Sequence, residues 1–241
     1  MNQETKYNPY VSVDCVVFGF DGEKLKVLLN ERNIKEKHEW YNDKKLPGSL
    51  LLKDEDLDDA AIRILNERTG LKNIYLSQFH SFGNPQRTKN PRDILWLENM
   101  TKLKIERIVT VGYVALIKIK RKIQVLADNT ELNWYDLKDV KRMRLAFDHA
   151  EIIQKGLEHI RHNLNIEPYL FFELLPRKFT ISQLRILHDT VHQVHSDVRN
   201  FQKKVTQMPY VIALDELEKK VPHRAARLYK FERKNLGMSK M

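Results

Sequence analysis

Cysteine is almost absent from this 241-residue chain, in which Cys15 is the only one. A single cysteine cannot form an internal disulfide, and Cys15 lacks the partners that a thiolate metal site would need. It lies in the apolar run VDCVVFGF, which is typical of a buried strand. We therefore expect a structural role for Cys15 and a reducing, cytoplasmic environment for the protein.

Long hydrophobic runs are missing as well. No stretch of the sequence approaches the ~20 apolar residues that a membrane-spanning helix needs. The opening sequence MNQETKYNPY lacks the basic start and apolar segment of a secretory signal. Hydrophobic residues nevertheless make up 42% of the chain, which is enough to build a packed core. The composition therefore predicts a folded protein that acts away from membranes.

Positive charge is plentiful and unevenly distributed, within a formal net charge of +10. From residue 165 onward there are 14 Lys and Arg against 8 Asp and Glu, whereas the first 164 residues hold 28 against 24. The last third of the chain is therefore the more basic part. A basic region indicates a polyanionic partner, with nucleic acid as the first candidate. A surface that merely keeps the protein in solution is the simpler alternative.

Three runs rich in β-branched residues predict strands in the first part of the chain: VSVDCVVFGF, KLKVLLNER and RIVTVGYVALIKI. Asp21 and Gly22 separate the first two runs, and Asp-Gly at this place is a hairpin signal. These two strands are therefore expected to pair antiparallel.

Helical patterns lie between and after these strands. Residues 57–69 carry apolar side chains at helical spacing, and Gly70 follows them as a typical C-terminal cap. Another helix is expected over about residues 148–163. Strands and helices together predict a mixed α+β domain, which we assign to residues 1–164.

The remainder of the chain, residues 165–241, follows a different pattern. EPYLFFELL is a short helix candidate, and TISQLRILHDTV follows it with Thr180 and Gln183 spaced as a capping box. SDVRNFQKKVTQM predicts a third helix, with Ser196 or Asp197 as its N-cap. Two strand-like runs, YVIAL and ARLYKFE, come last. Three helices followed by a β-hairpin is the order of a winged helix-turn-helix.

The segment from Leu46 to Leu71, LPGSLLLKDEDLDDAAIRILNERTGL, resembles the Nudix box, whose pattern is G-x5-E-x7-R-E-U-x-E-E-x-G-U with U a bulky apolar residue. Aligned on the terminal TGL, this chain keeps the pattern at Glu55, Arg63, Leu65, Glu67, Gly70 and Leu71. It departs from the pattern at Ser49, Ile64 and Arg68. LPG also matches the usual approach to the box. The resemblance implies a Nudix-like α/β/α fold for the first domain.

The departures from the box bear on catalysis. Nudix hydrolases cleave a diphosphate linked to another moiety with Mg²⁺ or Mn²⁺, and these hard cations need oxygen ligands. Ile64 offers no lone pair and Arg68 would repel a cation, so we expect no bound metal, no cofactor and no hydrolysis. Arg63 and Glu67 are spaced to form an ion pair. Two alternatives stay open, namely a divergent Nudix hydrolase and a direct grip of Arg68 on an anionic phosphate.

Further segments resemble one branch of this family, the Nudix-related transcriptional regulators, which join a Nudix-type effector domain to a C-terminal winged helix. FGNPQRTKNPR, RIVTVGYVALI and LAFDHAEII look like parts of their first domain, and FELLPRKFTISQLRILHDTV, RNFQKKV and HRAARLYKF match their second. The resemblance implies a regulator, expected to be a repressor, that binds a double-stranded DNA operator as a homodimer. An effector would release it from DNA by favouring a DNA-incompetent arrangement, although activation by the ligand is left open.

Two effector classes occur among these regulators. One branch recognises ADP-ribose and related nucleotides and controls NAD genes, and another recognises L-arabinose and controls sugar-utilisation genes. We expect a pentose, because the acidic helix is largely lost and a neutral sugar needs hydrogen-bonding side chains and an aromatic face. ADP-ribose is the alternative. The residues expected around the effector are Glu31, Arg32, Tyr41, Lys45, Asn84, Arg107, Trp134, Asp148 and His149.

Each of these assignments has a simpler structural counterpart. Trp134, and Trp40 beside the cleft loop, could be ordinary core aromatics. Asp148 and His149 could merely cap the helix that starts there.

The second helix of the helix-turn-helix is expected to enter the major groove of DNA. Its predicted buried stripe consists of Val198, Phe201, Val205 and Met208, so the polar residues between them face away. Arginine suits guanine edges, asparagine and glutamine suit adenine, and lysine more often contacts phosphate. A solvated basic face is the simpler alternative. The predicted DNA-binding residues of the domain are Thr180, Gln183, Arg199, Asn200, Lys203, Lys204, Gln207, His223, Arg224 and Arg227.

The wing carries HRAA where the regulators commonly have a GRPA-like motif. Arg224 is therefore expected in the minor groove and Arg227 at a backbone phosphate. His188 and His192 have the i, i+4 spacing of metal ligands but lack an HExxH pattern and a nearby cysteine, so a structural or phosphate-facing role is expected. An RNA-binding adaptor is a further alternative for this basic domain.

Overall fold

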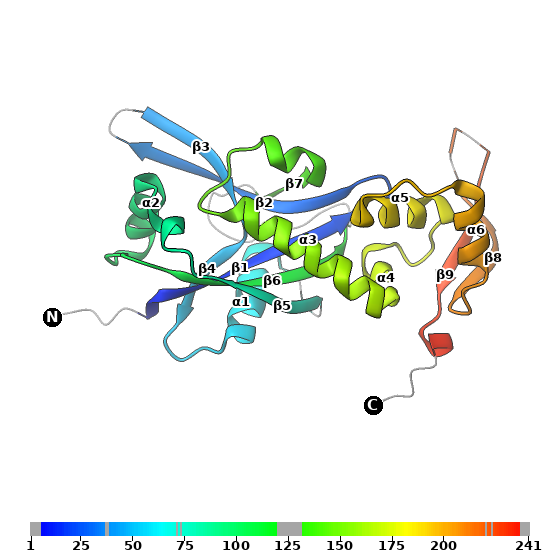
Figure 1. Cartoon of the computed structure of the whole chain (residues 1–241), viewed down its shortest axis with the longest axis horizontal. Helices are drawn as coiled ribbons and strands as arrows, with labels where there is room; N and C mark the ends of the chain where they lie inside the picture. The colour runs from blue at the N-terminus through cyan, green and yellow to red at the C-terminus, as the bar shows by residue number, and fades with distance from the viewer. Residues whose placement is uncertain are drawn as a thin grey trace.

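The computed structural model describes residues 6–36, 39–70, 72, 74–119, 132–219, 221–222 and 224–236. Its larger sheet has seven strands (Figure 1). Their bounds are β1 Tyr7–Phe20, β2 Leu25–Glu36, β3 Glu39–Lys45, β4 Gly48–Leu52, β5 Tyr75–Phe82, β6 Val109–Lys118 and β7 Leu132–Asp136.

The sheet is ordered β3-β2-β1-β6-β5, with β4 paired to β1 and β7 paired to β2. The strand pairs are antiparallel except for β1 and β6, which run parallel at its centre. The hairpin predicted at Asp21 and Gly22 is confirmed, since Phe20 pairs with Leu25 across it. Gly22 has φ +105°, a backbone conformation that residues with a Cβ rarely adopt.

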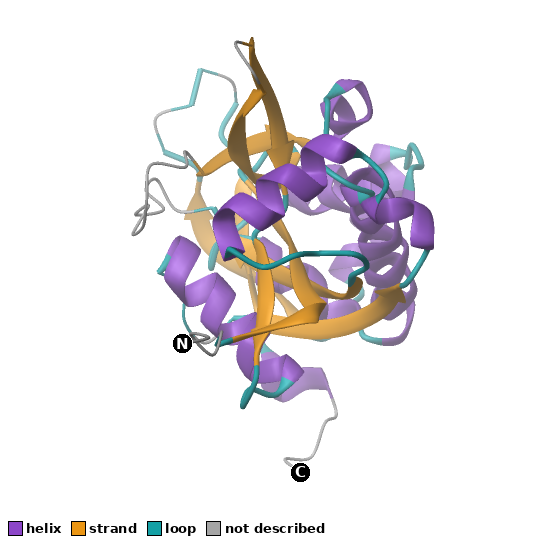
Figure 2. Ribbon diagram, turned by 90° about the vertical axis from the view of Figure 1, so that its left-hand side faces the viewer, coloured by secondary structure: helices purple, strands orange, loops and turns teal. Residues whose placement is uncertain are grey.

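Helices cover both faces of this sheet (Figure 2). Alternate residues of β1 explain the two layers, because successive side chains of a strand point to opposite faces. Cys15 and Val17 pack with α1 (Leu57–Thr69), whereas Val16 and Phe18 pack with α3 (His149–Ile166). The expected α/β/α arrangement and the buried position of Cys15 are thereby confirmed.

Helix α1 begins and ends as the sequence predicts. The Asp56 side chain accepts a hydrogen bond from the Asp58 amide, and Gly70 closes the helix with φ +68°. The helix α2 (Pro91–Thr101) was not predicted, although Asn90 caps it and Pro91 occupies its first turn. Two 3₁₀ turns, η1 (Pro85–Thr88) and η2 (Leu137–Arg142), complete this part of the chain.

The C-terminal unit has the predicted order of helices and strands (Figure 1). The expected capping box is present, since Thr180 accepts from the Gln183 amide and Gln183 accepts from the Thr180 amide. These elements are η3 Pro168–Leu170, α4 Phe171–Leu174, α5 Ile181–His192, α6 Val198–Thr206, β8 Val211–Leu217, β9 Arg227–Phe231 and η4 Arg233–Leu236.

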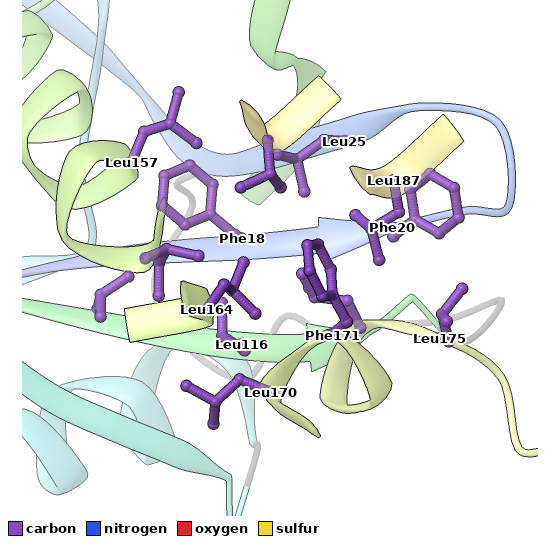
Figure 3. Packing of buried hydrophobic residues seen from close by; sticks show 14 of the residues in the cluster. Phe18, Phe20, Leu25, Leu116, Leu157, Leu164, Leu170, Phe171, Leu175 and Leu187 are labelled. Carbon is purple, nitrogen blue, oxygen red and sulfur yellow. The ribbon is translucent and has the colours of Figure 1, made fainter. Parts of the chain in front are cut away.

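The two units share one hydrophobic core. Phe18, Phe20 and Leu116 from the sheet belong to the same buried cluster as Phe171 of α4 and Leu187 of α5 (Figure 3). Helix α3 continues to Ile166, across the boundary predicted between residues 164 and 165. The winged helix is therefore packed against the sheet and is not joined to it by a linker alone.

Within the described part of the chain, no helix combines the length and hydrophobicity needed to cross a membrane.

Candidate effector pocket and nucleic-acid interface

A pocket with a cavity volume of about 120 Å³ lies at the end of the sheet next to α2. Strands β1 and β4, the start of α3 and the helices α1 and α2 all contribute to its wall. Its lining residues are Tyr7, Ser12, Asp14, Lys45, Gly48, Ser49, Leu50, Arg68, Arg87, Trp96, Leu97, Met100, Thr101, Ile108, Thr110, Phe147 and His149.

Lys45 is the buried cation of this pocket, with 5% of its surface exposed. Burial and the neighbouring Arg68 charge lower the pKa of its ammonium group to about 8. The ammonium lies 5.1 Å from the Trp96 ring and donates to the Leu46 carbonyl oxygen. No carboxylate of the described residues lies within ion-pair distance of Lys45 or Arg68. Asp14 and Asp43 act on Lys45 as neighbouring charges but do not reverse the lowering of its pKa, so the described lining residues carry an excess of positive charge.

Asp14 is the one carboxylate among the lining residues that the structure describes. Burial would raise its pKa, but the nearby His149, Arg87 and Lys45 outweigh burial and hold the pKa below its usual value. The carboxylate fits because its strand neighbour is Gly48, where an added Cβ would lie 1.8 Å from Asp14 Oδ1. The glycine of LPG is thus a steric requirement of the pocket wall.

His149 has a defined hydrogen-bonding pattern. Its Nδ1 accepts from the Leu46 amide at 3.0 Å, so this nitrogen carries no proton. Its Nε2 lies 3.6 Å from Asp14 Oδ2. The nitrogen that can donate is therefore Nε2, which faces Asp14.

Two buried arginines brace the pocket. Arg87 forms a bidentate pair with Asp148, with both nitrogen–oxygen distances at 2.8 Å. Arg32 pairs with Asp43 and Asp93 behind the pocket. Since both guanidinium groups are already paired, they hold the walls in place more than they attract a ligand.

The altered Nudix helix places its residues in three different environments. Ile64 is 1% exposed and packs in the core beneath the sheet. Glu67 is exposed and lies 3.4 Å from Arg63, so the predicted ion pair is confirmed. Arg63 binds Glu55 more closely, at 2.6 Å. Arg68 lines the pocket, so the helix offers the pocket a guanidinium where the family pattern has a carboxylate.

Of the predicted effector residues, Lys45 and His149 line the pocket. Asp148 does not line the pocket but pairs with Arg87, which does. Its side chain makes no capping hydrogen bond to α3. Glu31 lies on β2, where it accepts from the Tyr135 hydroxyl. Of these four residues, only the first two reach the cavity.

The remaining predicted effector residues, including Arg32 with its two carboxylate partners, do not line it. Tyr41 lies in the β2–β3 hairpin, with the Arg92 guanidinium 3.5 Å from its ring centre. Asn84 caps η1, and Arg107 donates to the Gly83 carbonyl. Trp134 packs against the core beneath the sheet, where its ring would meet a Cβ on Gly19.

The structural alternative is therefore correct for Trp134 and incorrect for Trp40, which is 68% exposed. Sequence reasoning missed Asp14, Arg87 and Trp96 as pocket residues. Asp14 carried a usable signal, since it is the charged residue in an otherwise apolar strand. Trp96 lies on α2, and because this helix was not predicted, the sequence did not place Trp96 at the pocket.

The helix α6 presents a basic face. Phe201 and Val205 are buried and Met208 is partly buried, as expected, but Val198 is 57% exposed and does not join the stripe. It lies at the first turn of α6, beyond the edge of the core. The predicted contact residues Arg199, Asn200, Lys203, Lys204 and Gln207 are exposed. The face is therefore free to meet a polyanion.

The other predicted DNA-binding residues differ in whether their side chains already make hydrogen bonds within the protein. The Thr180 hydroxyl and the Gln183 amide oxygen are engaged in the α5 cap. Arg227 donates to Asp215 at 2.9 Å and to the Leu214 carbonyl. Arg224 is exposed, and His223 lies outside the described residues.

Comparison with known families gives two matches along the chain. The NUDIX domain matches residues 8–156, and the NrtR DNA-binding winged helix domain matches residues 171–231. The observed fold is thus a Nudix domain followed by a winged helix.

Relatives share the whole arrangement. The chain is 29% identical to the ADPR responsive transcriptional repressor NtrR of Acinetobacter baylyi over 95% of this chain and 85% of the relative. It is similar to Shewanella oneidensis NrtR complexed with a 27mer DNA, with 26% identity, a TM-score of 0.67, and 92% and 93% of the two chains covered. A MutT/nudix family protein from Enterococcus faecalis is also similar, with 27% identity, a TM-score of 0.63, and coverage of 93% and 88%.

Proposed function

This chain belongs to the Nudix family and carries an NrtR-type winged helix behind its Nudix domain, and from this premise we propose that it is a DNA-binding transcriptional repressor controlled by a nucleotide effector. The relatives support the general class, since one is a transcriptional repressor and another is an NrtR in complex with DNA. The exposed basic face of α6 supports the same class on physical grounds.

We propose ADP-ribose or a closely related nucleoside diphosphate as the effector. The observation that carries this proposal is the pair formed by Lys45 and Arg68, two cations without a carboxylate partner in the described residues. A diphosphate would neutralise both, whereas a neutral pentose would leave Asp14 and Asp43 as the negative charges that act on the buried ammonium. Trp96 and Phe147 add aromatic surface that suits an adenine base.

The pentose that the sequence led us to expect has less support. That preference assumed that losing the acidic helix also removes any site for phosphate. The structure suggests the opposite inference, because Arg68 occupies the pocket wall and can bind phosphate without a bridging metal. The ADPR-responsive relative favours the nucleotide as well.

We further propose that the pocket binds the diphosphate without hydrolysing it. Lys45 and Arg68 line the pocket and would repel Mg²⁺. Asp14 could supply a carboxylate oxygen, but it already interacts with His149 and Arg87. The family's metal would therefore fit this donor set poorly. Incubating the purified protein with ADP-ribose and Mg²⁺ should release no AMP, and steady release above a metal-free control would contradict the proposal.

DNA binding is tested with α6. A homodimer would place two copies of α6 over two half-sites of an operator, as two-fold symmetry requires. R199E with K203E should abolish the shift of operator DNA in gels, because two phosphate or base contacts become repulsive. K155E is the matched control, since Lys155 is exposed on α3 and lies outside the basic face. Equal affinity of the double variant and the control would rule out α6 as the recognition helix.

The effector is tested with the same DNA. Fragments upstream of the NAD and sugar-utilisation operons of the host should be titrated with protein in the presence of ADP-ribose or L-arabinose. We expect ADP-ribose to weaken binding and arabinose to have no effect. Release by arabinose alone would restore the pentose hypothesis.

A further inference from the structure

A second cavity lies inside the winged-helix unit, away from the effector pocket. It has a volume of about 320 Å³, is lined by the end of α3 and by the helices α4, α5 and α6, and is partly open at its surface. Leu164 and Phe171, both visible in Figure 3, belong to its wall. Its remaining lining residues are Phe172, Leu184, His188, His192, Phe201, Lys204, Val205, Met208 and Tyr210.

The wall is mostly apolar and largely aromatic. The cavity has room for a ring, since apolar cavities of roughly 150 Å³ already bind benzene. Phe171, Phe172, Phe201 and Tyr210 supply ring faces and edges on several sides. The cavity is therefore suited to a flat hydrocarbon body of about one ring.

One side of the cavity is positively charged. Lys204 lines it and has no carboxylate partner among the described residues. Arg161 of α3 acts on His192 as a neighbouring charge, and its buried Nη2 has no hydrogen-bond partner in the described part of the chain. Asp189 acts on His192 as an opposing charge, but it is already engaged by Arg185, Ser196 and His188. The excess charge at this side selects an anion.

The two histidines of the cavity, His188 and His192, also favour an anion over a metal cation. The rings of His188 and His192 lie 4.6 Å apart, which could suggest a metal pair. Burial, together with His188, Arg161 and Lys204, lowers the pKa of His192, so the surroundings oppose an added positive charge. A cation is therefore disfavoured here. His188 already contacts Asp189 through Nδ1 at 3.2 Å, so its Nε2 and the His192 ring are the groups that can donate to an anionic head group.

We propose that this cavity is a second ligand site, which takes a small aromatic carboxylate with its ring among the phenylalanines and its carboxylate at Lys204. The site is independent of the nucleotide pocket proposed above. It lies against the buried side of α6, since Phe201 and Val205 form part of its wall. A molecule bound there would touch the same helix that is proposed to meet DNA.

Two methionines allow ligand binding at the two sites to be monitored separately. Met208 lines the second cavity and Met100 lines the nucleotide pocket. The full-length protein labelled with ¹³C at the methionine methyl groups should be titrated with benzoate, benzyl alcohol and acetate. M208L and M100L assign the two signals.

Benzoate should shift the Met208 signal in a saturable manner and leave the Met100 signal unchanged. Benzyl alcohol and acetate should bind at least about tenfold more weakly, because each lacks either the charge or the ring. ADP-ribose should shift Met100 instead, so a failure at either methyl group concerns one proposal alone.

The charge requirement is tested with K204Q. This variant should bind benzoate about tenfold more weakly, whereas K203Q, which alters a neighbouring lysine that does not line the cavity, should retain the wild-type affinity for benzoate. The proposal is overturned if Met208 does not respond, if benzyl alcohol binds as tightly as benzoate, or if K204Q and K203Q behave alike.

Discussion

At the scale of single residues, Lys45 is the buried cation of the candidate effector pocket. Its ammonium group is held in a place that disfavours charge, since burial and Arg68 both act against protonation. Such a group is costly in the empty protein and useful when an anion arrives, because the anion removes the penalty. A binding site that is unfavourable until filled is consistent with a sensor.

The first prediction concerns stability and pH. The pKa of Lys45 falls from 10.5 to about 8 on folding, so below pH 8 the lysine is charged in both states and the penalty is fully present. Between pH 8 and 10.5 the folded state loses the proton first, and the penalty disappears. K45M should therefore raise the free energy of unfolding by about 3 kcal/mol at pH 7, with a gain that shrinks towards pH 10.5.

Urea denaturation of the wild type and K45M across this pH range measures the effect. K44M alters the half-buried neighbour on the same strand and should change the free energy of unfolding much less. A K45M gain that is constant with pH would show that Lys45 is not the titrating group.

The second prediction concerns ligand affinity. R68Q should weaken ADP-ribose binding by about tenfold or more, because it removes a guanidinium that has no other partner in the described residues. Affinity of the wild type should also fall as the pH rises through about 8, where Lys45 loses its proton. Isothermal titration calorimetry measures both. K53Q, an exposed substitution outside the pocket, should bind normally, and an R68Q affinity equal to that of K53Q would refute the phosphate contact.

The residues of the pocket could be predicted only in part. Lys45 and His149 were found because polar groups near the LPG loop and the start of a helix indicate a cleft. Arg68 was noticed through its departure from the Nudix pattern, but its preference for phosphate depended on which way it points. Arg87 and Asp148 lie 61 residues apart and meet only in the folded chain, so spacing alone could not pair them.

At the scale of elements, apolar strands and well-capped helices were predicted and partly polar strands were missed. Strands β1, β2 and β6 are rich in β-branched or buried residues, and α1 and α5 carry clear caps. By contrast, β3 reads EWYNDKK and β5 reads YLSQFHSF. Their polar residues interrupt the alternation of apolar and polar positions that marks a strand in a sequence. These strands form because neighbours offer hydrogen bonds and one covered face, which is tertiary information.

The third prediction concerns the cap of α5. T180A should lower the free energy of unfolding by about 1 kcal/mol, because the Gln183 amide loses its acceptor at the helix start. T180S keeps a hydroxyl at the cap and should lose much less. Thermal or urea denaturation distinguishes the two, and equal losses would show that the methyl group, not the cap, provides the stability.

At the scale of the whole molecule, the shared core connects the pocket to the winged helix. The turn between β1 and β2 lies against α5, where the Gln183 side chain is 3.0 Å from the position of a Cβ on Gly22. Strand β2 continues from this turn to Arg32, which braces the pocket. A shift of β2 on ligand binding would therefore reach the start of α5 through contacts that are already packed.

The fourth prediction follows from this connection. If ADP-ribose weakens operator binding by a given factor, operator DNA must weaken ADP-ribose binding by the same factor. Fluorescence anisotropy of labelled DNA gives the first factor, and calorimetry with and without DNA gives the second. ADP-ribose affinity that is the same with and without operator DNA would contradict the coupling between the pocket and the winged helix.

The parallel pairing of β1 with β6 has a consequence for how the chain acquires this structure. Ser12 and Thr110 face each other there although 98 residues separate them. The middle of the sheet therefore cannot close while the ribosome has delivered only the first strands, and a large loop must lose its freedom before the ladder forms. Refolding from denaturant should be slow for a chain of this length, and β1 and β2 must wait as an exposed hairpin until β6 arrives.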